Sequence, residues 1–353
     1  MALPNMALMS SSPPSVTIQE VADLAGVSPK TVSRVINNEP RVSADTRTRI
    51  LKAIEQLNYR PNLNARGLAS NRSFLIGLFC EKAGDYLSEF QAGAVQRCRE
   101  SNFHLMVEPW DLQSADIESQ IDTLLGQLRL EGVILLPPLS DHAVVLNKLK
   151  DASIPIVRIA PKHRLSTSPA IGIDDYVAAR QVTAHLIGLG HRRIGFILGR
   201  PEHGAAGQRY SGFVDEMRAR QMPLDSDLVQ AGNFVYADAL ICTQRMLRAA
   251  APPTAIFASN DVMAAAVVSM ARRLGLDLPG QLSVAGFDDA PCAQMLWPDL
   301  TTVRQPVAGM ARIAADLIIR FEPRRNGWPE PIPLHLLGHE LVIRNSTARP
   351  ARR

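Results

Sequence analysis

The sequence is poor in cysteine and contains no long hydrophobic segment, and both facts narrow the class of protein. Its 353 residues include four cysteines, whose spacing fits neither a disulfide framework nor a metal-ligand set: Cys80, Cys98, Cys242 and Cys292. No apolar run reaches the roughly 20 residues that a membrane span requires. Residues 1–15 lack the basic start and apolar core of a signal peptide. We therefore expect a cytoplasmic protein with reduced thiols and no membrane partner.

Patterns typical of enzymes are also missing. The eight histidines show no metal-ligand spacing, and the chain has neither a Gly-x-Ser-x-Gly motif nor a phosphate-binding glycine loop. The segment GLGHRRIG, residues 188–195, lacks the spacing of a dinucleotide-binding fingerprint and follows a helical stretch where that fingerprint would open one. We therefore expect no catalytic site, no cofactor and no metal.

The positive charge of the chain is concentrated near its N-terminus. The formal net charge is +4, and residues 1–72 contain nine Lys and Arg against five Asp and Glu. That segment accounts for the whole excess, so the rest of the chain is neutral overall. A basic N-terminal segment on a neutral body predicts that a polyanion binds at this end.

The stretch VTIQEVADLAGVSPKTVSRVINN, residues 16–38, predicts two short helices joined by a tight turn. Thr17 and Glu20 have the spacing of a capping box at the start of the first helix. Gly26 suits the left-handed conformation that ends a helix. Ser28 can cap the second helix, and Pro29 suits its first position. The spacing therefore predicts a helix-turn-helix.

The second helix of this pair has two different faces. Val32, Val35 and Ile36 share one face and are expected to pack inward. The opposite face presents basic and amide side chains, which suit the DNA major groove: Lys30, Arg34 and Asn37. Spacing alone leaves open an ordinary helical hairpin with a solvated basic face.

A third helix and a short linker follow the pair. Ser43 is a cap for a helix to about Leu57, whose expected inward stripe has four members: Ile50, Leu51, Ile54 and Leu57. The segment NLNARGLA, residues 62–69, is too short to be stable as an isolated helix, and Gly67 weakens it further by about 1 kcal/mol.

From Phe74 onward, buried strands alternate with amphipathic helices, and the alternation runs through two successive units. Such alternation is typical of parallel sheets with helices on both faces. The fold class is therefore multi-domain: an all-α helix-turn-helix head followed by an α/β domain of two lobes. Ligands of doubly wound folds bind outside the carboxyl ends of the strands, so we expect a binding cleft between the lobes.

Polar residues that follow the predicted strands are the candidates for this cleft. Carboxylates and amides can bond sugar hydroxyls, and an arginine can bridge two oxygens. Two aromatic residues are further candidates as platforms for a sugar ring. The set comprises Tyr86, Asp175, Arg209, Phe234, Asn260, Asp261 and Asp288. Asp174 or Asp261 could instead cap the next helix, Asp289 could face solvent, and Trp297 is expected to pack at a crossover between the lobes.

The strings AGVSPKTVSRVINN and RVSADTRTRILKAIEQLNYRPNLNARGLAS resemble the lactose-repressor (LacI) family of bacterial transcription regulators, and a looser resemblance continues to the chain end. The resemblance implies that the second helix enters the major groove, with Lys30 and Arg34 at base edges and Pro29 offering an apolar contact. The remaining candidates would hold phosphates or position that helix: Thr17, Ser28, Thr31, Ser33, Asn37 and Tyr59. It also implies a hinge helix in which Leu68, with Ala65 a turn before it, enters the minor groove.

The resemblance extends to the effector domain, which in this family is similar to periplasmic sugar-binding proteins. Arg209, Asn260 and Asp288 match the family's usual effector contacts, and Asp175 and Asp261 are further candidates. One segment departs from the family: EKAGDYLSEF, residues 81–90, keeps an aromatic at Tyr86 but lacks the Asn-Pro-aromatic turn common after the first strand. This departure leaves the identity of the ligand open.

The expected domain boundaries follow from these features. Residues 1–15 form a disordered tail, 16–61 the DNA-binding domain, 62–72 the hinge, and 73–345 the effector-binding and dimerisation domain. Lobe 1 is expected at about 73–162 and 292–321, lobe 2 at about 163–291 and 322–345, and residues 346–353 as a frayed tail. The start of translation stays open between Met1, Met6 and Met9.

The resulting hypothesis is a homodimeric repressor of carbohydrate-utilisation genes. It would bind a pseudo-palindromic operator in double-stranded DNA and be released by a small sugar-like effector. Three alternatives remain open: a regulator that needs a corepressor such as a nucleobase, a sugar-binding protein without DNA function, and an enzyme that uses the cleft.

Overall fold

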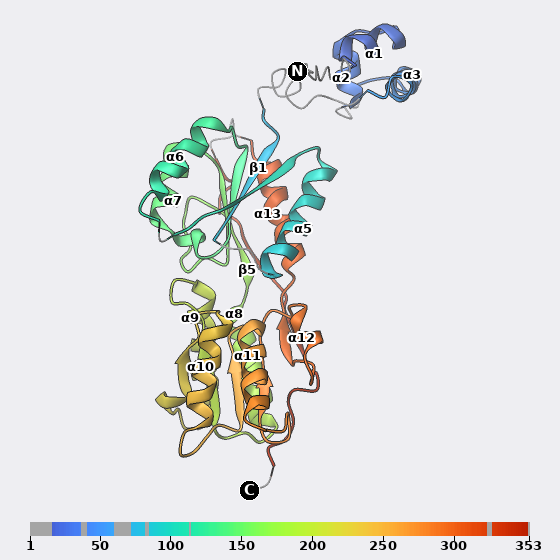
Figure 1. Cartoon of the computed structure of the whole chain (residues 1–353). Coiled ribbons are helices and arrows are strands. Elements are labelled where there is room, and N and C mark those ends of the chain that lie inside the picture. The colour runs from blue at the N-terminus through green and yellow to red at the C-terminus, as the bar shows by residue number, and fades with distance from the viewer. Residues whose placement is uncertain are drawn as a thin grey trace, which may run out of the picture. The chain divides into compact units, whose positions relative to one another are not determined.

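The computed structural model of the chain divides into two compact units, residues 1–73 and 74–353 (Figure 1). The structure describes residues 16–36, 41–59, 72–81, 85–112, 114–322 and 327–351. The expected tail at 1–15, most of the hinge segment and three predicted DNA contacts lie outside the described residues: Asn37, Ala65 and Leu68.

The first unit contains three helices: α1 (Ile18–Ala25), α2 (Pro29–Ile36) and α3 (Ala44–Gln56). The predicted capping box at the start of α1 is present, because the Thr17 hydroxyl accepts from the Glu20 amide and the Glu20 carboxylate accepts from the Thr17 amide. Gly26 ends α1 with a φ of 64°, in the left-handed region that glycine tolerates. The local sequence therefore sets the boundaries of the helix pair.

The core of the first unit differs from the prediction at one position. Ile50 is fully buried, but Leu51 is 52% exposed, and Ala53 takes its place in the core. Positions 50, 53, 54 and 57 repeat at the spacing of one helix face, whereas position 51 lies about 100° around the helix from position 50. The apolar character of Leu51 therefore did not indicate burial.

The first lobe of the second unit is built on a six-stranded parallel sheet with the order β11-β5-β4-β3-β1-β2. Its strands are β1 (Leu75–Cys80), β2 (His104–Pro109), β3 (Gly132–Leu135), β4 (Ile156–Ile159), β5 (Ala170–Ile173) and β11 (Leu334–Leu337). One face packs on α5 (Asp85–Glu100) and α13 (Val307–Ile319), and the other on α6 (Ile117–Gln127) and α7 (Ala143–Asp151), as Figure 1 shows. A one-turn helix, η1 (Leu139–Asp141), precedes α7.

Two strands were assigned to the wrong lobe by the sequence analysis. Residues 163–173 and the final strand region were expected in lobe 2, but β5 pairs with β4 and β11 in the first sheet. A buried four-residue strand such as AIGI suits either sheet, and only its hydrogen bonds to distant strands decide between them. The chain therefore enters the second lobe after Ile173.

The second lobe is built on a four-stranded parallel sheet with the order β7-β6-β8-β9. Its strands are β6 (Ile194–Leu198), β7 (Val229–Ala231), β8 (Ala255–Ala258) and β9 (Ser283–Ala285). Phe196 packs toward α8 (Asp175–Gly188) and α9 (Gly204–Ala219), and Ile197 packs toward α10 (Tyr236–Leu247) and α11 (Asp261–Arg273), as expected for alternating strand residues. The short helices η2 (Ser226–Leu228) and α12 (Cys292–Met295) complete this lobe.

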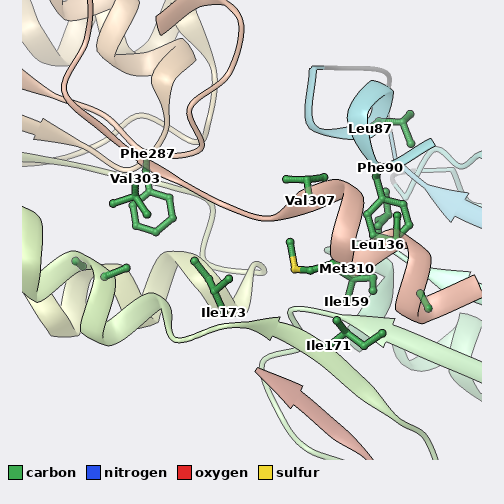
Figure 2. Packing of buried hydrophobic residues seen from close by; sticks show 14 of the residues in the cluster. Leu87, Phe90, Leu136, Ile159, Ile171, Ile173, Phe287, Val303, Val307 and Met310 are labelled. Carbon is green, nitrogen blue, oxygen red and sulfur yellow. The ribbon is translucent and has the colours of Figure 1, made fainter. Parts of the chain in front are cut away.

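The lobes are joined by crossing segments that share a buried cluster. Phe287 and Val303 lie at one end of the cluster and Leu87 and Phe90 at the other, with Ile173 and Met310 between them (Figure 2). Strands β10 (Thr302–Arg304) and β12 (Glu340–Val342) pair as an antiparallel ribbon within the crossing segments. Continuous apolar burial across this region supports a defined arrangement of the two lobes.

Asp289 belongs to the crossing segments and does not face solvent, contrary to the alternative considered for it. Its side chain is 4% exposed and pairs with Arg304 at 2.7 Å and with Arg344 at 2.6 Å. Arg304 also pairs with Glu340 at 2.8 Å. Asp289 therefore links segments that leave and re-enter the second lobe.

The expected frayed tail at 346–353 is wrong for the residues that the structure describes there. Ser346 is 1% exposed, and its hydroxyl donates to the Val284 carbonyl at 2.6 Å. The Ala348 carbonyl lies 2.9 Å from Nε2 of His191, which is fully buried. The polar tail residues thus pair with polar groups of the second lobe that would otherwise be buried without partners.

The segment from the end of α12 onward is more exposed than expected. Trp297, which the sequence placed in a packed crossover, is 77% exposed, and Met295 is 81% exposed. Across the described parts of the chain, no helix is long and apolar enough to cross a membrane.

Candidate functional site

The candidate DNA-binding surface is the outward side of α2. Lys30 is exposed, and Val32 and Val35 on the opposite side are buried, as the two-faced pattern predicts. Arg34 and Ser33 are half-buried. The second helix therefore presents Lys30 to solvent while its apolar side holds it in the three-helix core.

The other predicted DNA contacts have defined roles within the first unit. The Ser28 hydroxyl accepts from the Thr31 amide at 3.3 Å and lies 2.9 Å from the Thr31 hydroxyl, so Ser28 caps α2. The Tyr59 ring is 9% exposed and belongs to the small core, and burial raises the pKa of its hydroxyl. Tyr59 was predicted either to hold a phosphate or to position the second helix, and its burial favours the positioning role.

A cavity of about 240 Å³ lies between the two lobes of the second unit. Six of the seven residues predicted from the strand ends line it: Tyr86, Asp175, Arg209, Phe234, Asn260 and Asp288. Tyr86 comes from the first lobe and the other five come from the second lobe. Phe234 and Asp288 follow strands, Asp175 and Asn260 lie at helix starts, and Arg209 lies within α9. The topological rule for doubly wound folds thus located the cavity.

Arg209 is the central charged residue of the cavity. It is 5% exposed, and its Nε donates to Asp175 at 2.8 Å while Nη1 donates to the Ser259 carbonyl at 2.5 Å. Nη1 also lies 3.5 Å from the Asp288 carboxylate, and the guanidinium stacks 3.6 Å from the centre of the Phe287 ring. These contacts fix the guanidinium and balance its charge with two carboxylates.

Asp288 lies in an unusual backbone conformation at the cavity wall. Its φ is 114°, a value that L-residues rarely adopt, and such strain is typical of functional sites. The Gln305 side-chain amide donates to its carboxylate at 2.7 Å. Burial raises the pKa of Asp288 to about 6, although Arg209 and Gln305 act in the opposite direction. The carboxyl therefore holds its proton to a higher pH than an aspartate in solvent does.

Asp261, the seventh candidate, is fully buried and is not among the described residues that line the cavity. Its carboxylate accepts from the Thr302 hydroxyl at 2.6 Å and from the Ala290 amide at 2.8 Å. Burial, followed by the charge of Asp288, raises its pKa. Asp261 therefore holds a crossing segment, and the effector contact predicted for it lacks support from the geometry.

The capping alternatives are resolved by neighbouring residues. The Asn260 side-chain oxygen accepts from the Met263 amide at 2.9 Å, so Asn260, and not Asp261, caps α11. Asp174 caps α8 by accepting from the Val177 amide at 2.8 Å. At each of these strand ends one polar residue caps the next helix, and at Asn260 the cap also lines the cavity.

The two predicted aromatic platforms both lie at the cavity. Tyr86 stacks near Phe90 with ring centres 6.4 Å apart, and burial together with the carboxylates of Asp288 and Asp175 raises its pKa. The Phe234 ring lies over Gly199, where a Cβ atom would collide with it. Gly199 is therefore needed for the ring to reach the cavity wall.

Several lining residues were missed by the sequence analysis. His203 lines the cavity, its Nε2 has no hydrogen-bond partner among the described residues, and burial with the charge of Arg200 lowers its pKa to about 4. Glu81 and Gln305 also line the cavity. Glu81 directly follows β1 and His203 follows β6, so the strand-end rule would have found both if it had been applied to every strand.

A two-lobed α/β domain whose lobes enclose a cavity with a few charged and amide side chains is the architecture of a small-molecule-binding domain, and the first unit is a helix-turn-helix. Together they define a DNA-binding transcription regulator with a ligand-binding domain. A sequence profile described as "Bacterial regulatory proteins, lacI family" matches residues 17–62, and one described as "Periplasmic binding protein-like domain" matches residues 183–347. The chain belongs to the lacI family of bacterial regulatory proteins.

Relatives of known role cover nearly the whole chain. The HTH-type transcriptional regulator DegA of Bacillus subtilis is 31% identical over 94% of this chain and 98% of its own length. Catabolite control protein A of Priestia megaterium is 30% identical over 94% of this chain and 99% of its length. The regulator GalR of Salmonella typhimurium is 31% identical over 95% of this chain and 96% of its length.

Solved structures agree with this assignment. The lac repressor dimer bound to operator and the anti-inducer ONPF has a TM-score of 0.77 and 27% identity, covering 95% of this chain and 99% of that one. The regulator CelR in complex with cellobiose has a TM-score of 0.71 and 29% identity, and the match covers 94% of this chain and 99% of that one. The predicted family and fold class are confirmed.

Proposed function

We propose that this regulator represses carbohydrate-utilisation genes and that a small, uncharged, sugar-like effector releases it from a pseudo-palindromic operator. The observation that supports the effector class most directly is the charge balance of the cavity. Arg209 already contacts two carboxylates, Asp175 and Asp288, and the third acid of the lining, Glu81, is paired with Arg200. Among the described lining residues Arg209 is the one arginine or lysine, and it is already paired, so an anionic effector would meet these acids unfavourably, whereas hydroxyl groups could donate to them.

Names of relatives give additional support. One similar structure is a complex with cellobiose, and another contains the lac repressor with ONPF. The cavity of this chain offers carboxylates, an amide and two aromatic rings at its surface, a combination that suits a polyhydroxylated ring. A corepressor-dependent regulator that binds a nucleobase remains the alternative.

A thermal-shift screen of the full chain with sugars and nucleobases tests the effector class. We expect neutral sugars to raise the unfolding temperature and uronic acids of matched stereochemistry to raise it less. Operator titration with the best compound then gives the sign of the coupling. Stabilisation by nucleobases alone would contradict the sugar proposal, and tighter operator binding with the compound would indicate a corepressor.

On the DNA side, the first unit of each subunit is proposed to bind one half-site of the operator. In each half-site, Lys30 and Arg34 are proposed to contact base edges. The hinge at 62–72, with Ala65 and Leu68, is proposed to order on the operator. Replacing Lys30 or Arg34 by alanine should weaken binding to a duplex selected from a random library by about 1–3 kcal/mol and relax base preference at one position per half-site.

The exposed Lys52 on α3 provides a matched control for these variants. Lys52→Ala removes the same charge from the first unit but should leave base preference unchanged. Selection of bound sequences by each variant gives the measurement. A uniform loss of affinity on all sequences would assign Lys30 or Arg34 to phosphate contacts.

We also propose that the chain is a homodimer in the cytoplasm and that an exposed face of the second lobe contributes to the interface. Tyr236 on α10 bonds Ser269 on α11 at 2.8 Å, and Arg272, one turn further, bonds the Trp297 carbonyl at 3.1 Å. Trp297 is 77% exposed. Met295, two positions before it, is 81% exposed, and neighbouring exposed apolar side chains are typical of a protein contact.

Trp297→Asp should weaken the dimer by more than about tenfold, because interface tryptophans often dominate binding energy. Sedimentation equilibrium of the full chain measures the dissociation constant. Leu224→Asp, at a 39% exposed position on another part of the lobe, should leave it unchanged. Equal effects of the two substitutions would remove this face from the interface.

A further inference from the structure

An ion pair connects the two lobes beside the cavity. Glu81 directly follows β1 in the first lobe, and Arg200 follows β6 and Gly199 in the second lobe. Nη1 of Arg200 lies 2.6 Å from Oε2 of Glu81. The two residues are 119 positions apart in the chain, so the contact depends on the closure of the two lobes.

The pair is well placed to resist separation of the lobes. The side chains of Glu81 and Arg200 are 15% and 26% exposed, so water screens their attraction less than it screens a surface pair. Glu202 lies 3.6 Å from Nε of Arg200 and holds the other side of the guanidinium. The hydrogen bond to Glu81 raises the pKa of Arg200, so the guanidinium stays charged.

The pair also lies between two cavities. Glu81 lines the cavity of about 240 Å³ that contains Arg209. Arg200 and Glu202 line a second cavity of about 420 Å³, together with Asp141 and Lys162. The ion pair is therefore part of the wall that bounds the first cavity on the side of the second.

We propose that Glu81 and Arg200 form an ionic latch between the lobes, and that separation of the lobes requires this pair to break. The latch would set how often the cavity opens. Its meaning for effector entry rests on the proposed function, but the existence of the latch does not, and it can be tested without any effector.

The chain contains a reporter for such opening. Cys80 precedes Glu81, lines the cavity and is 2% exposed, so a thiol reagent reaches it when the lobes separate. Cys98 and Cys242 are buried in the cores of the first and second lobes and report general unfolding. The full chain is treated with iodoacetamide, and the alkylation rate of each cysteine is measured by peptide mass spectrometry.

Arg200→Met should increase the alkylation rate of Cys80 by at least about fivefold, as expected for the loss of a partly buried ion pair, and leave the rates of Cys98 and Cys242 unchanged. The double variant Glu81→Arg with Arg200→Glu should restore a slow rate, because it rebuilds the pair with the charges exchanged. Each rate is divided by the rate of the same variant in denaturant, which corrects for intrinsic thiol reactivity.

Arg193→Met is the matched control. It removes a pair of the same length, Arg193 with Asp225 at 2.6 Å, that lies wholly within the second lobe. The rate of Cys80 should not change in this variant. An unchanged Cys80 rate in Arg200→Met, a rise shared equally by all three cysteines, or a failure of the charge exchange to slow the reaction would overturn the latch.

Discussion

Arg209→Met is expected to abolish effector binding and to lower the free energy of unfolding of the second unit by about 3–5 kcal/mol. The substitution leaves the carboxylates of Asp175 and Asp288 buried without their cation and the Ser259 carbonyl without its donor. All three tryptophans lie in the second unit, so urea unfolding followed by tryptophan fluorescence reports this unit: Trp110, Trp297 and Trp328.

Arg180→Met provides the control for this prediction. Arg180 pairs with Glu216 at 2.8 Å but is 42% exposed, and Glu216 keeps a second partner in Arg220. Its loss should cost far less than the loss of Arg209, as for other exposed pairs. Under conditions where Arg209→Met stays folded, operator affinity should be retained without a response to effector. Similar destabilisation by both variants would contradict the central role assigned to Arg209.

The second large effect expected is on the pH dependence of stability. The pKa of Asp288 is about 6 in the folded protein against 3.8 as its ordinary value, so folding favours the protonated form. The contribution of Asp288 to the free energy of unfolding therefore decreases by about 3 kcal/mol as pH rises from about 4 to about 6, and it is constant at higher pH. Asp288→Asn removes this loss, so the variant should equal the wild type near pH 4 and exceed it by about 3 kcal/mol at pH 8.

The quantity to measure is the difference in the free energy of unfolding between the variant and the wild type at each pH. The difference is needed because buried histidines make the wild type more stable as pH rises, which opposes the effect of Asp288. The pKa of His203 is lowered to about 4, so its contribution is complete above 6.5 and is lost as pH falls toward 4. Asp225→Asn is the opposing control, since the Asp227 amide and Arg193 lower the pKa of Asp225. That variant should become less stable than the wild type as pH rises. A constant difference for Asp288→Asn across pH would show that its pKa is not raised.

The features that the sequence predicted well depend on local interactions. The capping box at Thr17 and the turn at Gly26 involve residues within one turn of helix, so the residue types and their spacing are enough to predict them. The cavity was found because parallel strands bring their carboxyl ends to one edge, a rule that needs the order of elements but no coordinates. Asn260 and Asp288 were located in this way, whereas Arg209, which lies within α9, was found through the resemblance to the family.

The failures concern contacts between distant segments. Strand β5 pairs with β11, more than 150 positions later in the chain, and nothing within AIGI distinguishes the two sheets. Ser346 is buried through a bond to Val284, 62 positions away. Asn260 and Asp261 are adjacent and chemically similar, so the direction of each side chain decided which one caps the helix and lines the cavity.

Asp288 and Asp289 have a consequence for engineering this regulator as a biosensor. Both have positive φ, of 114° and 55°, and one lines the cavity while the other pairs with Arg304 and Arg344 in the crossing segments. A substitution that retunes ligand preference at Asp288 will therefore also disturb the joint between the lobes. A library aimed at new ligands should vary the aromatic wall at Tyr86 and Phe234 and leave this dipeptide intact.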